Sequence, residues 1–148
     1  MYRHILIPTD GSELAHKAVV YGLSLAKALG AQITALVVEP PFHVFDVYHR
    51  TSDDLPAAYV RHGEHVKAHA AKVLAGVADE AKAAGVACDT IETEHDHAYE
   101  SIIATAKEKG CDLIVLASHG RSGLSAVVLG SVTNKVLTHS TIPVLVYR

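Results

Sequence analysis

The chain has 148 residues, of which 49% are hydrophobic and 20% charged, with a formal net charge of -3. This length can form one domain with a substantial core, and so apolar a composition excludes intrinsic disorder. No run of Lys and Arg stands out, so we expect no nucleic-acid binding.

The predicted elements alternate between strands and helices in chain order. Predicted strands cover 3–9, 32–38, 87–92, 113–117 and 143–147, and predicted helices cover 13–29, 57–84, 98–109 and 131–139. Ser12 can cap the first helix, and Gly30 ends it. Several strands are continuous apolar blocks, such as 113–116 (LIVL), which is typical of strands buried on both faces.

This order predicts one α/β domain, 1–148. We expect a single doubly wound, five-stranded parallel sheet, in the order 3-2-1-4-5, with helices on both faces. Ligands of such sheets bind beyond the carboxyl ends of the strands at the switch point, here between the first and fourth strands. Cys88 and Cys111 belong to strands that two others separate, too far apart for a disulfide, so we expect reduced thiols.

No stretch approaches the roughly 18 apolar residues that a membrane span requires. The apolar stretch near Met1 is too short for the core of a signal peptide. We therefore expect a cytoplasmic protein that makes no membrane contact.

A long connection, 39–56, follows the second predicted strand and contains both Phe residues of the chain. Compact domains rarely keep such loops without a purpose. It could form a lid over the crevice, a partner surface or a plain packing loop.

Two polar loops converge at the predicted switch point. The first strand ends in Pro8, Thr9 and Asp10, and the fourth ends in 117–120 (ASHG). Gly120, Gly123 and Gly130 would let a ligand approach the backbone closely.

Phosphate binding is the chemistry that the second loop suggests. With Ser131 as the cap of the last helix, the amides of Val132, Thr133 and Asn134 would point into the crevice. Nearby groups suited to phosphate oxygens are His119, Arg121 and the hydroxyls of Ser118, Ser122, Ser125, Ser131 and Thr133. Without further support, the same pattern also fits a structural turn.

Over nearly its whole length the sequence resembles the universal stress protein family. The segments 5–12 (ILIPTDGS) and 143–146 (PVLV) match the typical ends of that family. The stretch 117–131 is similar to its ATP-binding signature of glycine, two residues, glycine, nine residues, glycine, then Ser or Thr. Gly120, Gly130 and Ser131 fit the signature, whereas Ala117 replaces its first glycine.

The resemblance implies a site made of specific positions. Asp10 would face the nucleoside beside Pro8 and Thr9, although it could instead cap the first helix, and the Val37 backbone would meet the adenine edge. The ribose and phosphate loop would comprise Ser118, Gly120, Gly130, Ser131, Val132 and Thr133. An empty or altered pocket is the alternative that Ala117 leaves open.

The expected function is therefore that of a stress-response protein that binds ATP as a regulatory ligand, with Mg²⁺ accompanying the phosphates. The resemblance implies a homodimer that pairs the 143–147 edge strands antiparallel, together with a protein partner not identified by the sequence. A slow ATP hydrolase and a nucleotide-free dimeric adaptor are the alternatives. The P-loop pattern and the Gly-x-Ser-x-Gly nucleophile elbow are absent, and no catalytic residue is assigned.

Histidines form two further groups, but we predict no metal site. His62, His65 and His69 fall on one flank of the apolar stripe of the second helix, where they could chelate a metal or form a solvated or half-buried flank. We favour the solvated or half-buried flank, because no carboxylate or cysteine at a matching spacing completes a ligand set. Asp96 is the expected cap of the third helix.

Overall fold

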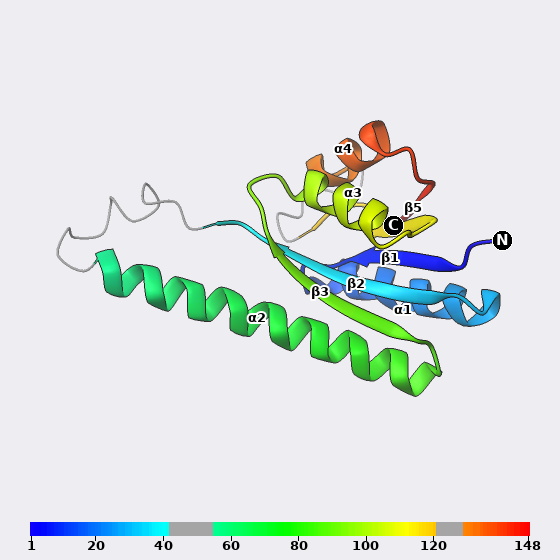
Figure 1. Cartoon of the computed structure of the whole chain (residues 1–148), viewed down its shortest axis with the longest axis horizontal. Coiled ribbons are helices and arrows are strands. Elements are labelled where there is room, and N and C mark those ends of the chain that lie inside the picture. Colours follow the sequence, from blue (N-terminus) through cyan, green and yellow to red (C-terminus); the bar gives the residue numbers. More distant parts are fainter. Residues whose placement is uncertain (42–54, 121–128) are drawn as a thin grey trace.

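The computed structural model describes residues 1–41, 55–120 and 129–148. Five parallel strands form one sheet in the order β3-β2-β1-β4-β5 (Figure 1). The strands are β1 (His4–Pro8), β2 (Gln32–Glu39), β3 (Cys88–Glu94), β4 (Leu113–Ala117) and β5 (Val144–Tyr147). The predicted fold class and strand order are confirmed.

Helices cover both faces of this sheet. They are α1 (Glu13–Leu29), α2 (Leu55–Ala84), α3 (Ala98–Glu108) and α4 (Ser131–His139). Helices α1 and α2 pack on one face, where Val19 and Val77 belong to the same buried cluster as Ile7 of β1. Helices α3 and α4 pack on the other face, where Ile102 and Val136 share a cluster with core residues of β1 and β4 (Figure 1). Burying each central strand between two helical layers explains its continuous apolar run.

The residues predicted to cap the starts of α1 and α3 are confirmed for α1 only. Ser12 caps α1 as predicted, because its hydroxyl accepts a hydrogen bond from the Ala15 amide at 3.3 Å. Asp96 does not cap α3: His97 occupies the cap position in an extended conformation, and its amide donates to His95 Nδ1 at 3.0 Å. The polar side chain nearest a helix start is therefore not always its cap.

The two cysteines lie on different parts of the sheet. Cys88 begins β3 and Cys111 precedes β4, with β2 and β1 between these strands, and both thiols are free. Burial raises the pKa of the Cys111 thiol to about 11. This buried thiol is therefore a poor nucleophile at neutral pH.

The strand order places the switch point between β1 and β4, which pair through Ile5 and Leu113. After β1 the chain turns to the α1 face, and after β4 it reaches α4 on the opposite face. The two departing segments leave a crevice at the carboxyl ends of the strands. Most of the connection 39–56, including 42–54, lies outside the described residues.

Candidate functional site

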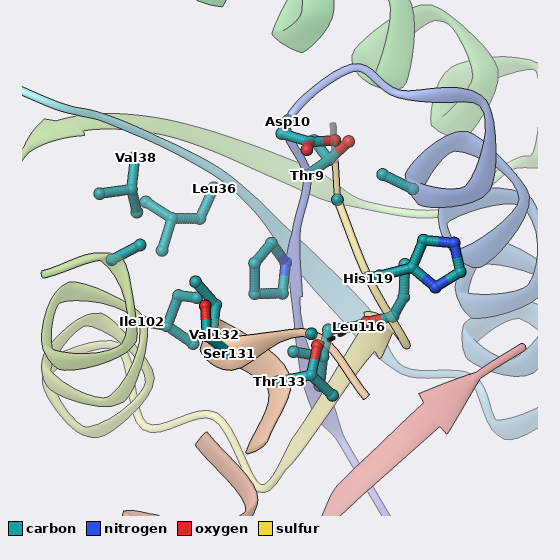
Figure 2. A pocket seen from close by; sticks show the side chains of 16 residues that line it. Thr9, Asp10, Leu36, Val38, Ile102, Leu116, His119, Ser131, Val132 and Thr133 are labelled. Atoms are coloured by element: carbon teal, nitrogen blue, oxygen red, sulfur yellow. Dashed lines mark hydrogen bonds between the residues drawn. The ribbon is translucent and has the colours of Figure 1, made fainter. Parts of the chain in front are cut away.

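A cavity of about 340 Å³ opens at the carboxyl ends of β1, β2 and β4, beside the first turns of α3 and α4 (Figure 2). This volume is at the small end of the usual range for small-molecule sites. Most of the predicted site residues line it: Pro8, Thr9, Asp10, Ala117, His119, Gly120, Gly130, Ser131, Val132 and Thr133. The remaining lining residues are Ala15, Leu36, Val38, Ala98, Ile102 and Leu116.

One wall of the cavity is apolar, and sequence reasoning missed it. Leu36 and Val38 of β2 and Ile102 of α3 lie together on one side in Figure 2, across the cavity from His119. Leu36 and Val38 are two residues apart, so their side chains share the sheet face that α3 covers. This alternation was a usable signal, but it is hidden inside an apolar run.

Val37, the β2 residue predicted for the site, faces the other way. Its side chain is buried in the core beneath α1 and α2, and it does not line the cavity. Its backbone nevertheless lies between the two β2 residues that do.

The loop after β1 brings a carboxylate to the cavity wall. Asp10 Oδ1 accepts a hydrogen bond from the Ser12 amide at 2.9 Å, so Asp10 supports the residue that caps α1 and is not the cap itself. A Cβ built on Gly120 would lie only 2.5 Å from Asp10 Oδ2. Gly120 is therefore the residue that lets the loop after β4 approach this carboxylate.

The start of α4 is the second polar element of the cavity. Gly130, not Ser131, is the cap: its amide donates to the Ser118 carbonyl, its carbonyl accepts from the Asn134 amide, and no described side chain caps the helix. Ser131 is already the first helical residue. The amides left without an acceptor inside the helix are thus those of Ser131, Val132 and Thr133, one residue earlier than predicted.

Thr133, predicted to contact the ribose or phosphates, lines the cavity and also makes a contact within the protein. Its side chain is buried, and its hydroxyl donates a hydrogen bond of 2.8 Å to the Ala117 carbonyl. This contact anchors the first turn of α4 to the end of β4 (Figure 2).

Ala117, which stands where the family signature has glycine, is the last residue of β4. It pairs with Tyr147 of β5, and its methyl group packs with Ala15 and Ala18 of α1. A strand residue is extended, so this position makes no demand for the positive φ that favours glycine. The methyl group is accommodated by the protein core.

Ser118 and His119 complete the described part of the loop. The Ser118 amide donates to the Tyr147 carbonyl at 2.7 Å, and its hydroxyl lies 3.1 Å from His119 Nδ1. Ser118 is buried and supports the loop without lining the cavity, whereas His119 lines it. Arg121, Ser122, Gly123 and Ser125 lie outside the described residues.

The three histidines of α2 do not form one site. His62 and His65 are exposed, whereas His69 is half-buried, with Nε2 3.2 Å from the Asp10 carbonyl oxygen. In the described ranges, no group of three or more His, Cys, Asp or Glu is placed to hold a metal ion. Within the same ranges, no helix is both long and apolar enough to cross a membrane.

The profile of the universal stress protein family matches residues 1–148. The chain belongs to the universal stress protein family. Universal stress protein YxiE of Bacillus subtilis is 36% identical over 156 aligned residues, covering 100% of both chains. Among solved structures, universal stress protein UspA of Lactobacillus plantarum has a TM-score of 0.83 and 26% identity, covering 99% of this chain and 98% of that one.

More distant universal stress proteins share the fold and were solved with ligands. One was solved in complex with cAMP, with a TM-score of 0.71, 23% identity and coverage of 99% of this chain and 97% of that chain. Another, from Archaeoglobus fulgidus, was solved in complex with dAMP, with a TM-score of 0.64, 16% identity and coverage of 99% and 98%.

Proposed function

We propose that this universal stress protein binds an adenine nucleotide, with ATP as its regulatory ligand. The observation that carries the proposal is that the uncapped start of α4 and an apolar wall face the same cavity. A helix start with free amides favours phosphate, and an apolar wall favours a flat base. A nucleotide combines the two.

The proposed orientation follows from the two ends of the cavity. The base lies against Leu36, Val38 and Ile102, and the phosphates lie at the amides of 131–133, beside Gly120 and His119. Asp10 reaches the ribose between them. Its carboxylate also suits Mg²⁺, which proteins bind through one or two carboxylates together with the phosphates of the substrate.

Relatives of the same fold support the choice of an adenine nucleotide. The universal stress proteins solved with cAMP and dAMP are too dissimilar in sequence for their site residues to be transferred. The agreement between 117–131 and the ATP-binding signature of the family supports the same ligand, and Ala117 is compatible with it because this position is extended.

Mass spectrometry of the nucleotide released from freshly purified, denatured protein identifies the natural ligand. We expect ATP, or ADP if the protein hydrolyses it. A sample that carries no nucleotide and also shows no binding of added ATP by calorimetry would refute the proposed function.

A charge placed at Val132 tests where the phosphates lie. Val132 lines the cavity, its side chain is 38% exposed, and it belongs to the first turn of α4, where Glu suits the helix dipole. Two unit charges about 7 Å apart repel by roughly 0.6 kcal/mol in water. A triphosphate carries several negative charges, so their summed repulsion of the Glu side chain in Val132→Glu should weaken ATP binding about tenfold. The uncharged control Val132→Gln should bind within about threefold of wild type.

The comparison between the two Val132 variants decides the orientation. Equal affinities for Glu and Gln would exclude phosphates near α4, even if ATP binding itself persists. Repeating the titrations with adenosine separates the contribution of the phosphates, because the Glu variant should bind adenosine as the Gln variant does.

We also propose that the protein forms a homodimer through β5, and that ATP occupancy biases this association or that of a protein partner. Strand β5 is at the edge of the sheet, and its residues Val144–Tyr147 are half-buried. Tyr21 of α1 is 43% exposed beside Tyr147, with ring centroids 5.6 Å apart. An apolar sheet edge usually needs covering, which supports a second copy as the partner.

A further inference from the structure

His69 is the one histidine of the α2 group that reaches the loop after β1. Its Nε2 lies 3.2 Å from the Asp10 carbonyl oxygen, in a partly buried contact. A carbonyl oxygen can only accept a hydrogen bond, so the imidazole carries hydrogen on Nε2 and donates it. This hydrogen bond joins α2 to the loop that carries the site carboxylate.

The next residue, Gly11, shows how tightly α2 encloses this turn. Gly11 adopts φ +78°, the left-handed region that favours glycine. A Cβ on Gly11 would lie 2.7 Å from Val73 Cγ2 and 3.3 Å from His69 Cε1. The two α2 side chains, one helical turn apart, therefore leave no room for a side chain at position 11.

The position of the turn determines where the Asp10 side chain lies. Its carboxylate is held by the Ser12 amide and lies so close to Gly120 that a single methyl group there would clash. Releasing the Asp10 carbonyl would let the Asp10–Gly11 peptide rotate, and the carboxylate would lose its place at the cavity wall. The His69 hydrogen bond is thus a contact of α2 that bears on the orientation of Asp10.

We propose that His69 is a positioning residue of the nucleotide site, which acts by donating a hydrogen bond to the Asp10 carbonyl. The inference rests on the proposed function, because it assigns to Asp10 a contact with the bound nucleotide. It also separates the three α2 histidines: His69 serves the site, and His62 and His65 are solvent-exposed.

The test compares two His69 variants with a control on the same helix. His69→Leu fills similar space without a donor, His69→Gln restores an N–H group on a flexible side chain, and His65→Leu alters an exposed residue one turn away. The hydrogen bond lies within the protein, so its loss lowers ATP affinity by at most the free energy that held the turn in place, which is on the order of fivefold for one neutral hydrogen bond. In calorimetric titrations with ATP we expect His69→Leu to bind about fivefold more weakly, and His69→Gln and His65→Leu to bind within about twofold of wild type.

Amide NMR resonances of the ligand-free protein provide a readout that does not depend on ATP. His69→Leu should shift the Gly120 resonance through the displaced Asp10 carboxylate, and His69→Gln should return it toward its wild-type position. The Gly11 resonance is not diagnostic, because loss of the imidazole ring beside it shifts it in either variant. Wild-type ATP affinity in His69→Leu, or a His69→Gln variant as weak as His69→Leu, would overturn the proposal.

The two proposals fail in different ways. If wild-type protein does not bind ATP, the proposed function fails. An unchanged Gly120 resonance in His69→Leu would separately refute the positioning role. If His69→Leu does not fold, the comparison between His69→Gln and wild type decides, because a purely space-filling role predicts that Gln weakens ATP binding as well.

Discussion

Replacing Thr133 with Val tests whether its hydroxyl serves the fold or the ligand. The Thr133 side chain is 3% exposed, and its hydroxyl donates to the Ala117 carbonyl at 2.8 Å. Val keeps the branched shape and removes the donor. Losing one buried hydrogen bond and leaving its acceptor with one partner fewer costs about 1–2 kcal/mol. For a domain of this size that lowers Tm by roughly 2–8 °C.

Urea denaturation and thermal scans would measure this loss, with Thr138→Val as the matched control. Thr138 is exposed on the same helix, and its hydroxyl donates to the Asn134 carbonyl at 2.9 Å. The control should change the free energy of unfolding by less than about 0.5 kcal/mol.

ATP affinity completes the test. Because the Thr133 hydroxyl is already engaged with the Ala117 carbonyl, we expect Thr133→Val to bind ATP within about threefold of wild type. Unchanged stability combined with a large loss of ATP binding would show that the hydroxyl contacts phosphate, and the anchoring role would be wrong.

Three further predictions concern other parts of the chain. Gly130→Val should weaken ATP binding by displacing the start of α4, since its Cβ would lie 3.1 Å from His119 Cα; wild-type affinity by calorimetry would contradict this. Val146→Glu should shift the protein toward monomer in sedimentation experiments, whereas an unchanged dimer would exclude the β5 interface. Burial opposes ionisation of Asp112, but hydrogen bonds from the His4 and Arg3 amides outweigh it and lower the pKa of this carboxyl from its ordinary value. Ionised Asp112 should therefore stabilise the fold at pH values above its ordinary pKa, and this stability should be lost as the pH falls through the lowered pKa. The urea midpoints of wild type and Asp112→Asn should then converge in acid, and a difference that does not depend on pH would refute the linkage.

The fold was predictable because its signals are local and repeated. Continuous apolar runs such as 113–116 require burial on both faces, and strict alternation of strands and helices leaves few topologies. Helix α1 begins and ends at its predicted residues because Ser12 and Gly30 act through their immediate neighbours. Signals of this kind survive in a single sequence.

Only the part of the candidate site that the loops after β1 and β4 form could be predicted from the sequence. Asp10, Gly120 and Gly130, which the sequence predicts at the switch point, line the cavity, because the ends of parallel strands meet at one edge of the sheet. The sequence did not predict that Gly130, and not Ser131, caps α4. The position of Gly130 depends on a hydrogen bond from its amide to the Ser118 carbonyl across the loop.

The alternation of Leu36 and Val38 assigns these side chains to one sheet face, but the sequence pattern does not show that they line a cavity. Nor does it show that His69 contacts Asp10. Leu36 and Ile102 are ordinary core residues until the sheet order brings β2 and α3 to the same cavity. His69 is 59 positions from Asp10, and only the packing of α2 beside the loop after β1 brings the two together. Contacts over such separations are set by tertiary structure.

The hydrogen bond from the Ser118 amide to the Tyr147 carbonyl connects the loop beside the cavity directly to β5, the edge strand of the sheet. Ala117 and Ser118, at the end of β4, thereby contact two neighbouring elements. The Ala117 carbonyl accepts a hydrogen bond from Thr133 of α4, and both residues lie beside Tyr147 of β5. A ligand that tightens 117–120 would also stiffen the edge where a second copy is expected to pair. Linkage then requires reciprocity: any factor by which the nucleotide strengthens pairing is the factor by which pairing strengthens nucleotide binding.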